Sequence, residues 1–389
     1  MSYISSNANR FYTALESGYG SLATISASNR IPAVKLTVSH KLAVTERKDK
    51  TGSRTFAGMP AGMRLQTTFD MTSYMRDWPD PSTLPSHGPL IEAAMGASGA
   101  LWGGNAAAAG STATNIAFAT PHGLTTGQAV TAGGEIRFAG AVTNPSMVVL
   151  NAPFSVAPTL GTPLGQTANY RLAAQLPSVT LFDYWDPATA VQRVLTGAAV
   201  DQMSISMNGD FHQFAFKGMA QDLVDSASFV AGQGGATAFP AEPPTNSFSY
   251  SPVPGNLGQV WLGVAPSQFF TVSAASVEIQ NNLDMRSQEY GTTLPLAIVP
   301  GMRSVMVTLE LFGQDDEATT GLYQAARQQS PVSMMFQLGQ VPGQLMGIYL
   351  QSLVPSVPVF DDSDKRLQWK FSDTRAQGTA ENEMMVAFG

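Results

Sequence analysis

Short stretches in which apolar and polar residues alternate recur along the chain and predict half-buried β-strands. The alternation is clear in VKLTVSHKL, residues 34–42, and again in ASVEIQNNL, residues 275–283. Two other stretches, GPLIEAAMGA at 88–97 and EATTGLYQAARQQ at 317–329, predict short helices. Acidic residues at 315–317 lie at the start of the second helix, as the helix dipole favours. The chain is therefore expected to be mainly β with a small helical part, an α+β fold.

The predicted strands fall into two similar series in the same order, which indicates an internal duplication. When Pro60 is set against Pro300, a shift of 240, the strands that follow these prolines align. Residues 221–224 align with 351–354 at a shift of 130. The first series therefore carries about 110 residues (240 − 130) that the second series lacks. We interpret this excess as an insertion within one copy.

Each series continues after its helix into a β-hairpin and a last pair of strands. The first hairpin, QMSISMNGDFHQFAFKGMA at 202–220, has the dipeptide Asn-Gly from Asn208 at its bend, a strong hairpin signal. We align it with VSMMFQLGQVPGQLMGIYLQ at 332–351. The closing segments of the two series, 247–265 and 367–388, are aligned in turn.

These alignments predict four parts of the chain. They are an N-terminal arm at 1–30, a first repeat at 31–99 plus 197–265, a small inserted β-domain at 100–196, and a second repeat at 266–389. The inserted part begins with a linker rich in Gly, Ala and Ser. We expect it to project from the body, since lengthening a surface loop costs little entropy.

The composition and net charge of the chain argue against several classes of function. The net charge of −7 argues against nucleic-acid binding as the main task, because phosphate affinity requires Lys and Arg. The chain has no cysteine, which excludes disulfides and thiol chemistry. Charged residues make up only 13% of the chain, so much neutral surface is expected to be covered in an assembly. We find no secretory leader and no apolar run of about 20 residues, and we expect a soluble protein made in a cytoplasm.

Candidate chemical groups do not form a recognisable site. The four histidines, His40, His87, His122 and His212, lie far apart, and we assign them to surface or turn positions. The acidic cluster in FDDSDKR, residues 360–366, lacks a calcium-binding loop and is interpreted as a solvated turn. Neither a P-loop, a dinucleotide fingerprint nor a nucleophile elbow is present. We therefore expect no enzyme activity, no cofactor and no metal.

The stretch GAAVDQMSISMNGDFHQFAFKG at 197–218, within a twice-written order of strand pair, helix and hairpin, resembles the tail tube proteins of tailed bacteriophages. The resemblance covers roughly 30–99 and 197–389. It implies two tandem tail-tube-like β-barrel or sandwich units, each with a short helix outside, arranged around a channel. It also implies a trimeric ring with pseudo-sixfold symmetry, preferred over a hexamer, whose copies stack into a tube for DNA passage. The partners would then be other copies of the chain, other tail proteins and transient DNA in the virion, without a membrane and with assembly in the host cytoplasm.

One face of the predicted strands is expected to line that channel. Its members are Lys35, Thr37, Asp70, Ser204, Ser206, Glu278, Gln280 and Glu310. Their charges are few and slightly acidic, so the wall would repel phosphate weakly and bind it poorly. A register slip of one residue would invert the assignment.

Other functions remain as alternatives. A carbohydrate-binding or adhesin-like β-protein would use exposed aromatic residues of the inserted part, mainly Tyr170, Tyr184 and Trp185. Another tail part on the same barrel, such as a hub or terminator, would stop at a single ring. A viral hydrolase is disfavoured because no acid–base constellation is found. The stretch LQWKFSD at 367–373 is interpreted as a terminal strand that could take part in a ring contact.

Overall fold

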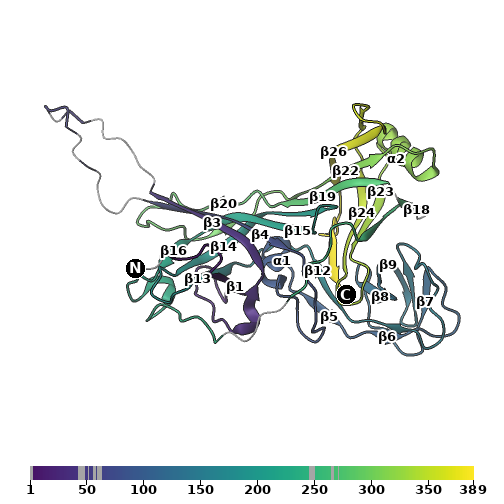
Figure 1. Cartoon of the computed structure of the whole chain (residues 1–389), viewed down its shortest axis with the longest axis horizontal. Coiled ribbons are helices and arrows are strands. Elements are labelled where there is room, and N and C mark those ends of the chain that lie inside the picture. The colour runs from purple at the N-terminus through teal and green to yellow at the C-terminus, as the bar shows by residue number, and fades with distance from the viewer. Residues whose placement is uncertain are drawn as a thin grey trace.

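The computed structural model describes residues 3–42, 49–50, 52–55, 58, 64–244, 250–263, 267–269 and 271–389. Pro60 and Gly62, used to align the two series, and parts of the segment 247–265 lie outside the described residues. Strands make up 46% of the chain and helical residues 7%, so the expected mainly β fold with two short helices is confirmed. Figure 1 shows the strands as long ribbons that cross the molecule, with the helices as small separate elements.

The elements fall into two series with a smaller group between them. The first series comprises β1 (Asn9–Leu15), β2 (Arg30–Ile31), β3 (Ala33–Leu42), β4 (Leu65–Tyr74), helix α1 (Gly88–Met95), β13 (Val179–Trp185), β14 (Arg193–Met207), β15 (Gln213–Ala220) and β16 (Asp222–Asp225). The second comprises β17 (Gly258–Leu262), β18 (Ser267–Phe269), β19 (Val272–Gln280), β20 (Asp284–Met285), β21 (Ile298–Val299), β22 (Ser304–Phe312), helix α2 (Glu317–Gln328), β23 (Val332–Leu338), β24 (Met346–Val354), β25 (Val359–Asp361), β26 (Gln368–Ala376) and β27 (Met385–Phe388).

The group between them forms two small sheets and connects to the large one. It comprises β5 (Ala100–Trp102), β6 (Asn105–Ala106), β7 (Asn115–Ala117), β8 (Ala129–Ala132), β9 (Glu135–Asn144), β10 (Met147–Leu150), β11 (Pro163–Leu164) and β12 (Thr167–Arg171). Strands β7, β10, β9 and β8 make a four-stranded sheet, and β11 pairs with β6. Two short 3-10 turns, at Ala27–Asn29 and Gln233–Gly235, complete the described elements.

Strand pairing follows the same scheme in both series. In the first, β1 pairs with β2 and β13, β13 with β14, and β14 with β16. In the second, β17 pairs with β18 and β23, β23 with β24, and β24 with β27. A second set of pairs also recurs: β3–β4, β4–β15 and β15–β14 correspond to β19–β22, β22–β26 and β26–β25. The long strand β14 therefore makes by itself the pairings that are divided between β24 and β25 in the second series.

This scheme corrects two of the alignments made from the sequence. The hairpin at 202–220 corresponds to β25 and β26, and not to residues 332–351, because β23 takes the pairing position of β13. Similarly, β17 takes the place of β1, so 247–265 is not the counterpart of 367–388. The error has a physical cause: strands of the same series share the same alternation of period two, so alternation alone cannot tell them apart.

One continuous antiparallel sheet crosses from the first series into the second. Its order is β3, β4, β15, β14, β19, β22, β26 and β25, joined where β14 pairs with β19. Figure 1 shows β3, β4, β14, β15 and β19 side by side along the upper part of the molecule. The sheet forms a half-barrel. Its apolar face, with Phe69, Phe216, Ile279 and Val307 buried, belongs to the main core.

Residues at the N-terminal end of each helix favour a helix start at that position. Helix α1 follows His87 and has a proline in its first turn, a position where the missing N–H has no helical partner. Helix α2 begins after Asp316, whose carboxylate accepts a hydrogen bond from the Thr319 N–H at 2.6 Å. The acids at 315–317 therefore mark a helix start, as expected from the sequence.

The N-terminal segment is largely part of the fold, and not a separate arm at 1–30 as expected. Strand β1 pairs along its length with β13, from Asn9 opposite Trp185 to Leu15 opposite Val179. Phe11 and Tyr12 are buried. The segment was misjudged because its apolar residues are few and lie close together, so they show no clear period over the whole stretch.

The segment expected as an inserted domain, 100–196, is not a unit apart from the large sheet; its part from β5 to β12 is called the insertion below. Strand β13 pairs with β1 and with the beginning of β14, so residues 179–196 are part of the first series. Strand β12 pairs with β5 and with β27 of the second series, so the insertion also adds two strands to the large sheet. The insertion also does not simply project. Its Ile136 and Phe138 pack with Met335 and Tyr349 of the second series in one buried cluster. In Figure 1 the insertion lies at the lower right, against the strands of the second series.

His87 joins helix α1 to the main sheet without contact with water. Its Nε2 lies 2.8 Å from the Ser73 hydroxyl of β4, and its ring meets Phe214 of β15 edge-on. Burial, assisted by the charge of Arg76, lowers the pKa of His87 to about 3. The folded protein therefore keeps this ring neutral at pH values where the unfolded chain already binds a proton.

Acid should for this reason destabilise the protein through His87. Because the folded pKa lies below the unfolded value of about 6.5, stability is complete above that pH and falls as pH decreases toward the folded pKa, by roughly 1.4 kcal/mol per pH unit. We expect His87→Gln to flatten this dependence. Denaturant unfolding of the dilute protein at several pH values between about 7 and 4.5 measures it. Parallel losses of stability in both proteins would contradict this role of His87.

Candidate functional site

The eight residues predicted to share one strand face do share it. Cross-strand partners point to the same side of an antiparallel sheet, and the register places Thr37 opposite Asp70. Across the junction of the two series, Ser204 lies opposite Glu278 and Gln202 opposite Gln280. The remaining members of the set, Lys35, Ser206 and Glu310, follow by the same alternation. None of the eight is buried, whereas most of their sequence neighbours on the strands pack in the core.

Several charged residues on this face were missed by the sequence analysis. Besides the predicted members, the register adds Lys41, Lys217, Asp361, Lys370 and Arg375. The face thus carries both cations and acids. The cations are Lys35, Lys41, Lys217, Lys370 and Arg375, and the acids are Asp70, Glu278, Glu310 and Asp361. The face is therefore closer to electrical balance than the eight predicted residues alone indicate.

Four of the charged residues on this face form two ion pairs. The Lys217 ammonium lies 3.9 Å from an Asp70 carboxylate oxygen, and the Lys370 ammonium lies 2.7 Å from Asp361. The hydrogen bond from Lys370 lowers the pKa of Asp361, and the same bond raises the pKa of Lys370. Paired cations attract phosphate less than free ones, because the carboxylate beside each one offsets its field.

The continuous sheet ends at two free edges. Among the described residues, β3 pairs only with β4, and β25 pairs only with β26. Each edge carries exposed apolar side chains: Val34 and Leu42 on β3 are 50% and 49% exposed, and Val359 and Phe360 on β25 are 65% and 52% exposed. Unpaired edges with apolar side chains favour association with another strand.

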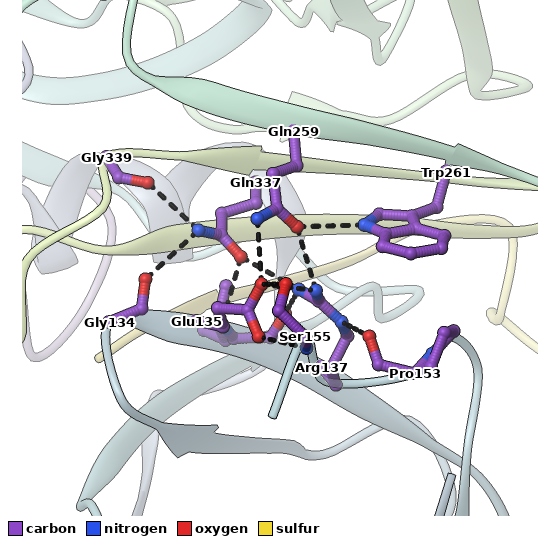
Figure 2. A network of polar contacts seen from close by, with 10 residues as sticks. Gly134, Glu135, Arg137, Pro153, Ser155, Gln259, Trp261, Gln337 and Gly339 are labelled. Carbon is purple, nitrogen blue, oxygen red and sulfur yellow. Dashed lines mark hydrogen bonds and ion pairs between the residues drawn. The ribbon is translucent and has the colours of Figure 1, made fainter. Parts of the chain in front are cut away.

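A buried arginine fixes the insertion to the second series, as Figure 2 shows. Arg137 of β9 is fully buried and pairs with Glu135 at 3.1 Å. Its guanidinium also donates to Gln337 of β23 and Gln259 of β17, each at 2.8 Å. Trp261 lies against the guanidinium at 5.1 Å from the ring centre. The insertion thus contacts the second series through a polar network as well as through apolar packing.

The network leaves few of its polar groups unsatisfied. The Arg137 Nε donates to the Pro153 carbonyl, and a second nitrogen donates to the Ile136 carbonyl. Glu135 accepts from the Ser155 backbone and hydroxyl and from the Gln259 amide. These bonds lower the pKa of Glu135 against the opposing effect of burial, and burial lowers the pKa of Arg137 to about 10. Both groups therefore stay charged at neutral pH.

The corresponding surface of the first series is covered differently. Tyr12, Phe182 and Tyr184 form a buried cluster against which Leu22, Ile25 and Phe239 pack. Nearby, Arg10 binds Glu242 and Asp186. The two series therefore have the same pairing scheme but different outer covers: the insertion on the second, and connecting segments of the chain on the first.

Histidines and aromatic residues offer no chemical centre. His87, His122 and His212 are 1%, 5% and 3% exposed, so a surface position is wrong for these three, although His87 lies in the turn before α1 and His40 is exposed. Each contacts a hydroxyl or backbone group instead. Within the described part of the chain, no group of three or more His, Cys, Asp or Glu residues could hold a metal ion. None of the described helices is long and apolar enough to cross a membrane.

The aromatic residues named for an adhesin do not form an exposed platform. Tyr170 is 0% and Tyr184 2% exposed, and Tyr170 packs edge-on against Phe388. Sugar binding at such residues requires an accessible ring face, so these two tyrosines cannot supply it. Of the three residues named for this alternative, only Trp185 keeps part of its side chain accessible.

Breaking the Arg137 network should destabilise the protein. Arg137→Met leaves Glu135 buried without its partner, and we expect a loss of about 3–5 kcal/mol in the free energy of unfolding. As a control, Arg286→Gln removes an exposed pair with Glu289 and should change stability by about 1 kcal/mol or less. Denaturant unfolding measures both values, and limited proteolysis shows whether cleavage begins in the insertion. Equal effects of the two substitutions would contradict the structural role of Arg137.

Comparison with known proteins gives one finding. The model of a family described as phage tail tube protein matches residues 88–388, which is well over half of the chain. The matched region contains the insertion, the junction of β14 with β19 and the whole second series. No curated protein matches the chain.

Proposed function

The chain belongs to the phage tail tube protein family, and from this we propose that it builds the tube wall as rings around a central channel. As a member of this family it is a structural component of the virion that assembles with itself and with other tail proteins. The observation that carries the proposal is the continuous sheet, which has one polar face, one core face and two unpaired edges.

The recurrent pairing scheme supports a trimeric ring. Two series in one chain, joined edge to edge through β14 and β19, act in the proposal as two tube units derived by duplication. Three chains then provide six units, so that the ring has pseudo-sixfold symmetry. Closure of a sheet into a barrel satisfies the edges that a single chain leaves open. No chemical step is needed for this role, and we propose none.

The polar face is the proposed wall of the channel. Its Lys and Arg side chains lie among carboxylates, and strong DNA binding requires cations that can release counterions from phosphate. A wall of nearly balanced charge, with two of its cations paired to carboxylates, would therefore let DNA pass without holding it. The predicted residues Lys35, Thr37, Asp70, Ser204, Ser206, Glu278, Gln280 and Glu310 are the proposed lumen positions.

The hairpin of β3 and β4 supports stacking of rings. Figure 1 shows these strands running side by side toward the upper left of the molecule. Their pairing continues to Leu42 opposite Leu65, and the Arg64 guanidinium donates to the Gln288 carbonyl at 3.0 Å. In the proposal, the exposed end of this strand pair, where Leu42 is 49% exposed, offers a contact along the tube axis. A hub or terminator would instead stop at one ring.

Purified protein at high concentration should assemble. We expect hollow rings with six lobes, each of three chains of 41.1 kDa, and stacks of such rings. Electron microscopy and light scattering of the same sample measure shape and mass. A monomer at every concentration would refute the tube role, and single rings that never stack would favour a hub or terminator.

The channel face can be tested with single cysteines, because the chain has none of its own. We expect Ser206→Cys in assembled tubes to react with a small maleimide but only slowly with a bulky polymer-linked one. Ser146→Cys, in an exposed turn of the insertion, should react readily with both reagents. A gel shift after timed labelling measures the rates. Equal rates with the bulky reagent at the two positions would place Ser206 outside the channel.

A further inference from the structure

We propose that neighbouring copies join through one defined strand pair: β25 of one copy lies antiparallel to β3 of the next, with Phe360 opposite Val38. This inference rests on the proposed ring and specifies its contact surface. It names the partner, a second copy of this chain, as well as the register and the side chain that is buried on assembly.

The template for this contact lies within the chain. Strands β14 and β19 belong to different series, yet they pair over six residues, from Gln202 opposite Gln280 to Met207 opposite Ala275. In the middle, Ile205 lies opposite Val277, and each is only 1% exposed. One junction between units is thus already formed and buried, and it shows how an edge of one unit fits the next.

Strand β25 is the counterpart of the outer part of β14. Both lie beside a strand with the pattern Gln-aromatic-x-Phe, which starts at Gln213 in β15 and at Gln368 in β26. Ile205 lies opposite Phe214, the aromatic residue of the first pattern. Phe360 lies opposite Trp369, the aromatic residue of the second. Phe360 therefore occupies the position of Ile205.

Strand β3 is the counterpart of β19. Both series have a register irregularity at the same place, between Ala33 and Lys35 in β3 and between Val272 and Ala274 in β19. Matching these irregularities sets Val38 in the position of Val277. A shared bulge fixes register more firmly than alternation does, because it marks a single position along the strand.

Combining the two correspondences gives the register between copies. Phe360 falls opposite Val38, as Ile205 falls opposite Val277. On either side, Val359 falls opposite Ser39, and Asp361 opposite Thr37. These pairs place Asp361 and Thr37 on the polar face and Phe360 and Val38 on the core face, so both faces of the sheet continue across the contact.

The exposed side chain of Phe360 supports a contact between copies at the β25 edge. Ile205 is 1% exposed, whereas its counterpart Phe360 is 52% exposed although it stacks on Trp369 at 5.0 Å. The difference arises because no further strand of the described residues pairs with β25 and covers Phe360. A strand placed there would bury this ring much as β19 buries Ile205.

The first experiment disrupts the contact by substitution. We expect Phe360→Asp to abolish rings in electron microscopy and leave a folded monomer with the circular dichroism of the parent protein. The matched control is Leu160→Asp, which puts the same charge on a 73% exposed side chain of the insertion. The control should still form rings. If both variants assemble like the parent protein, the proposed contact is wrong.

The second experiment tests the register and does not depend on a destabilising substitution. In the cysteine-free chain, Phe360→Cys together with Val38→Cys should give covalently linked copies after mild oxidation, seen on a denaturing gel. Phe360→Cys with His40→Cys, two residues farther along β3, should link at least tenfold less. Preferential linkage of the second pair, or none of the first in assembled rings, would overturn the inference.

The two proposals fail in different ways. If the parent protein forms rings while the Phe360 variants also assemble normally, the tube role stands and this contact is rejected. If the parent protein forms no ring under any condition, the proposed function itself fails and the contact fails with it.

Discussion

Every strand carries N–H and C=O groups on both sides, and the side without a neighbour must meet water or another chain. This constraint organises the molecule. Between the two series it is met by β14 and β19, which turn two potential edges into a buried junction. At the ends of the same sheet it is unmet, because β3 and β25 each have one partner among the described strands. Pairing with other copies of the chain would satisfy the backbone N–H and C=O groups along these two edges.

The same sheet separates two environments by alternation alone. Side chains at even and odd positions point to opposite faces, so a strand such as β19 can hold Val277 and Ile279 in the core and Glu278 on the polar face. Continuity of the sheet then extends this separation over both series. Correct strand register is therefore enough to separate a balanced polar wall from an apolar core. The bulges in β3 and β19 help to fix this register.

Sequence reasoning succeeded where the information was local. The alternation in β3 and β19 and the capping acids of α2 indicated these elements correctly. It failed where strands of equal period competed, so that β23 was taken as the counterpart of β14. The Gln-aromatic-x-Phe pattern at 213–216 and 368–371 was the signal that would have given the right alignment. The Arg137 network could not be foreseen, because its partners Gln259 and Gln337 lie more than a hundred residues away along the chain.

The unequal covers of the two series have a geometric consequence for the proposed wall. The insertion is fixed by Arg137 to the second series, while Leu22, Ile25 and Phe239 cover the corresponding surface of the first. Going around the proposed ring, outer surfaces formed by the first and the second series would then alternate in shape. The outer surface would repeat every third of a turn, whereas the channel wall would repeat nearly every sixth of a turn. Any protein that wraps such a cylinder would meet three equivalent attachment surfaces, and the shape of each surface would distinguish the first series from the second.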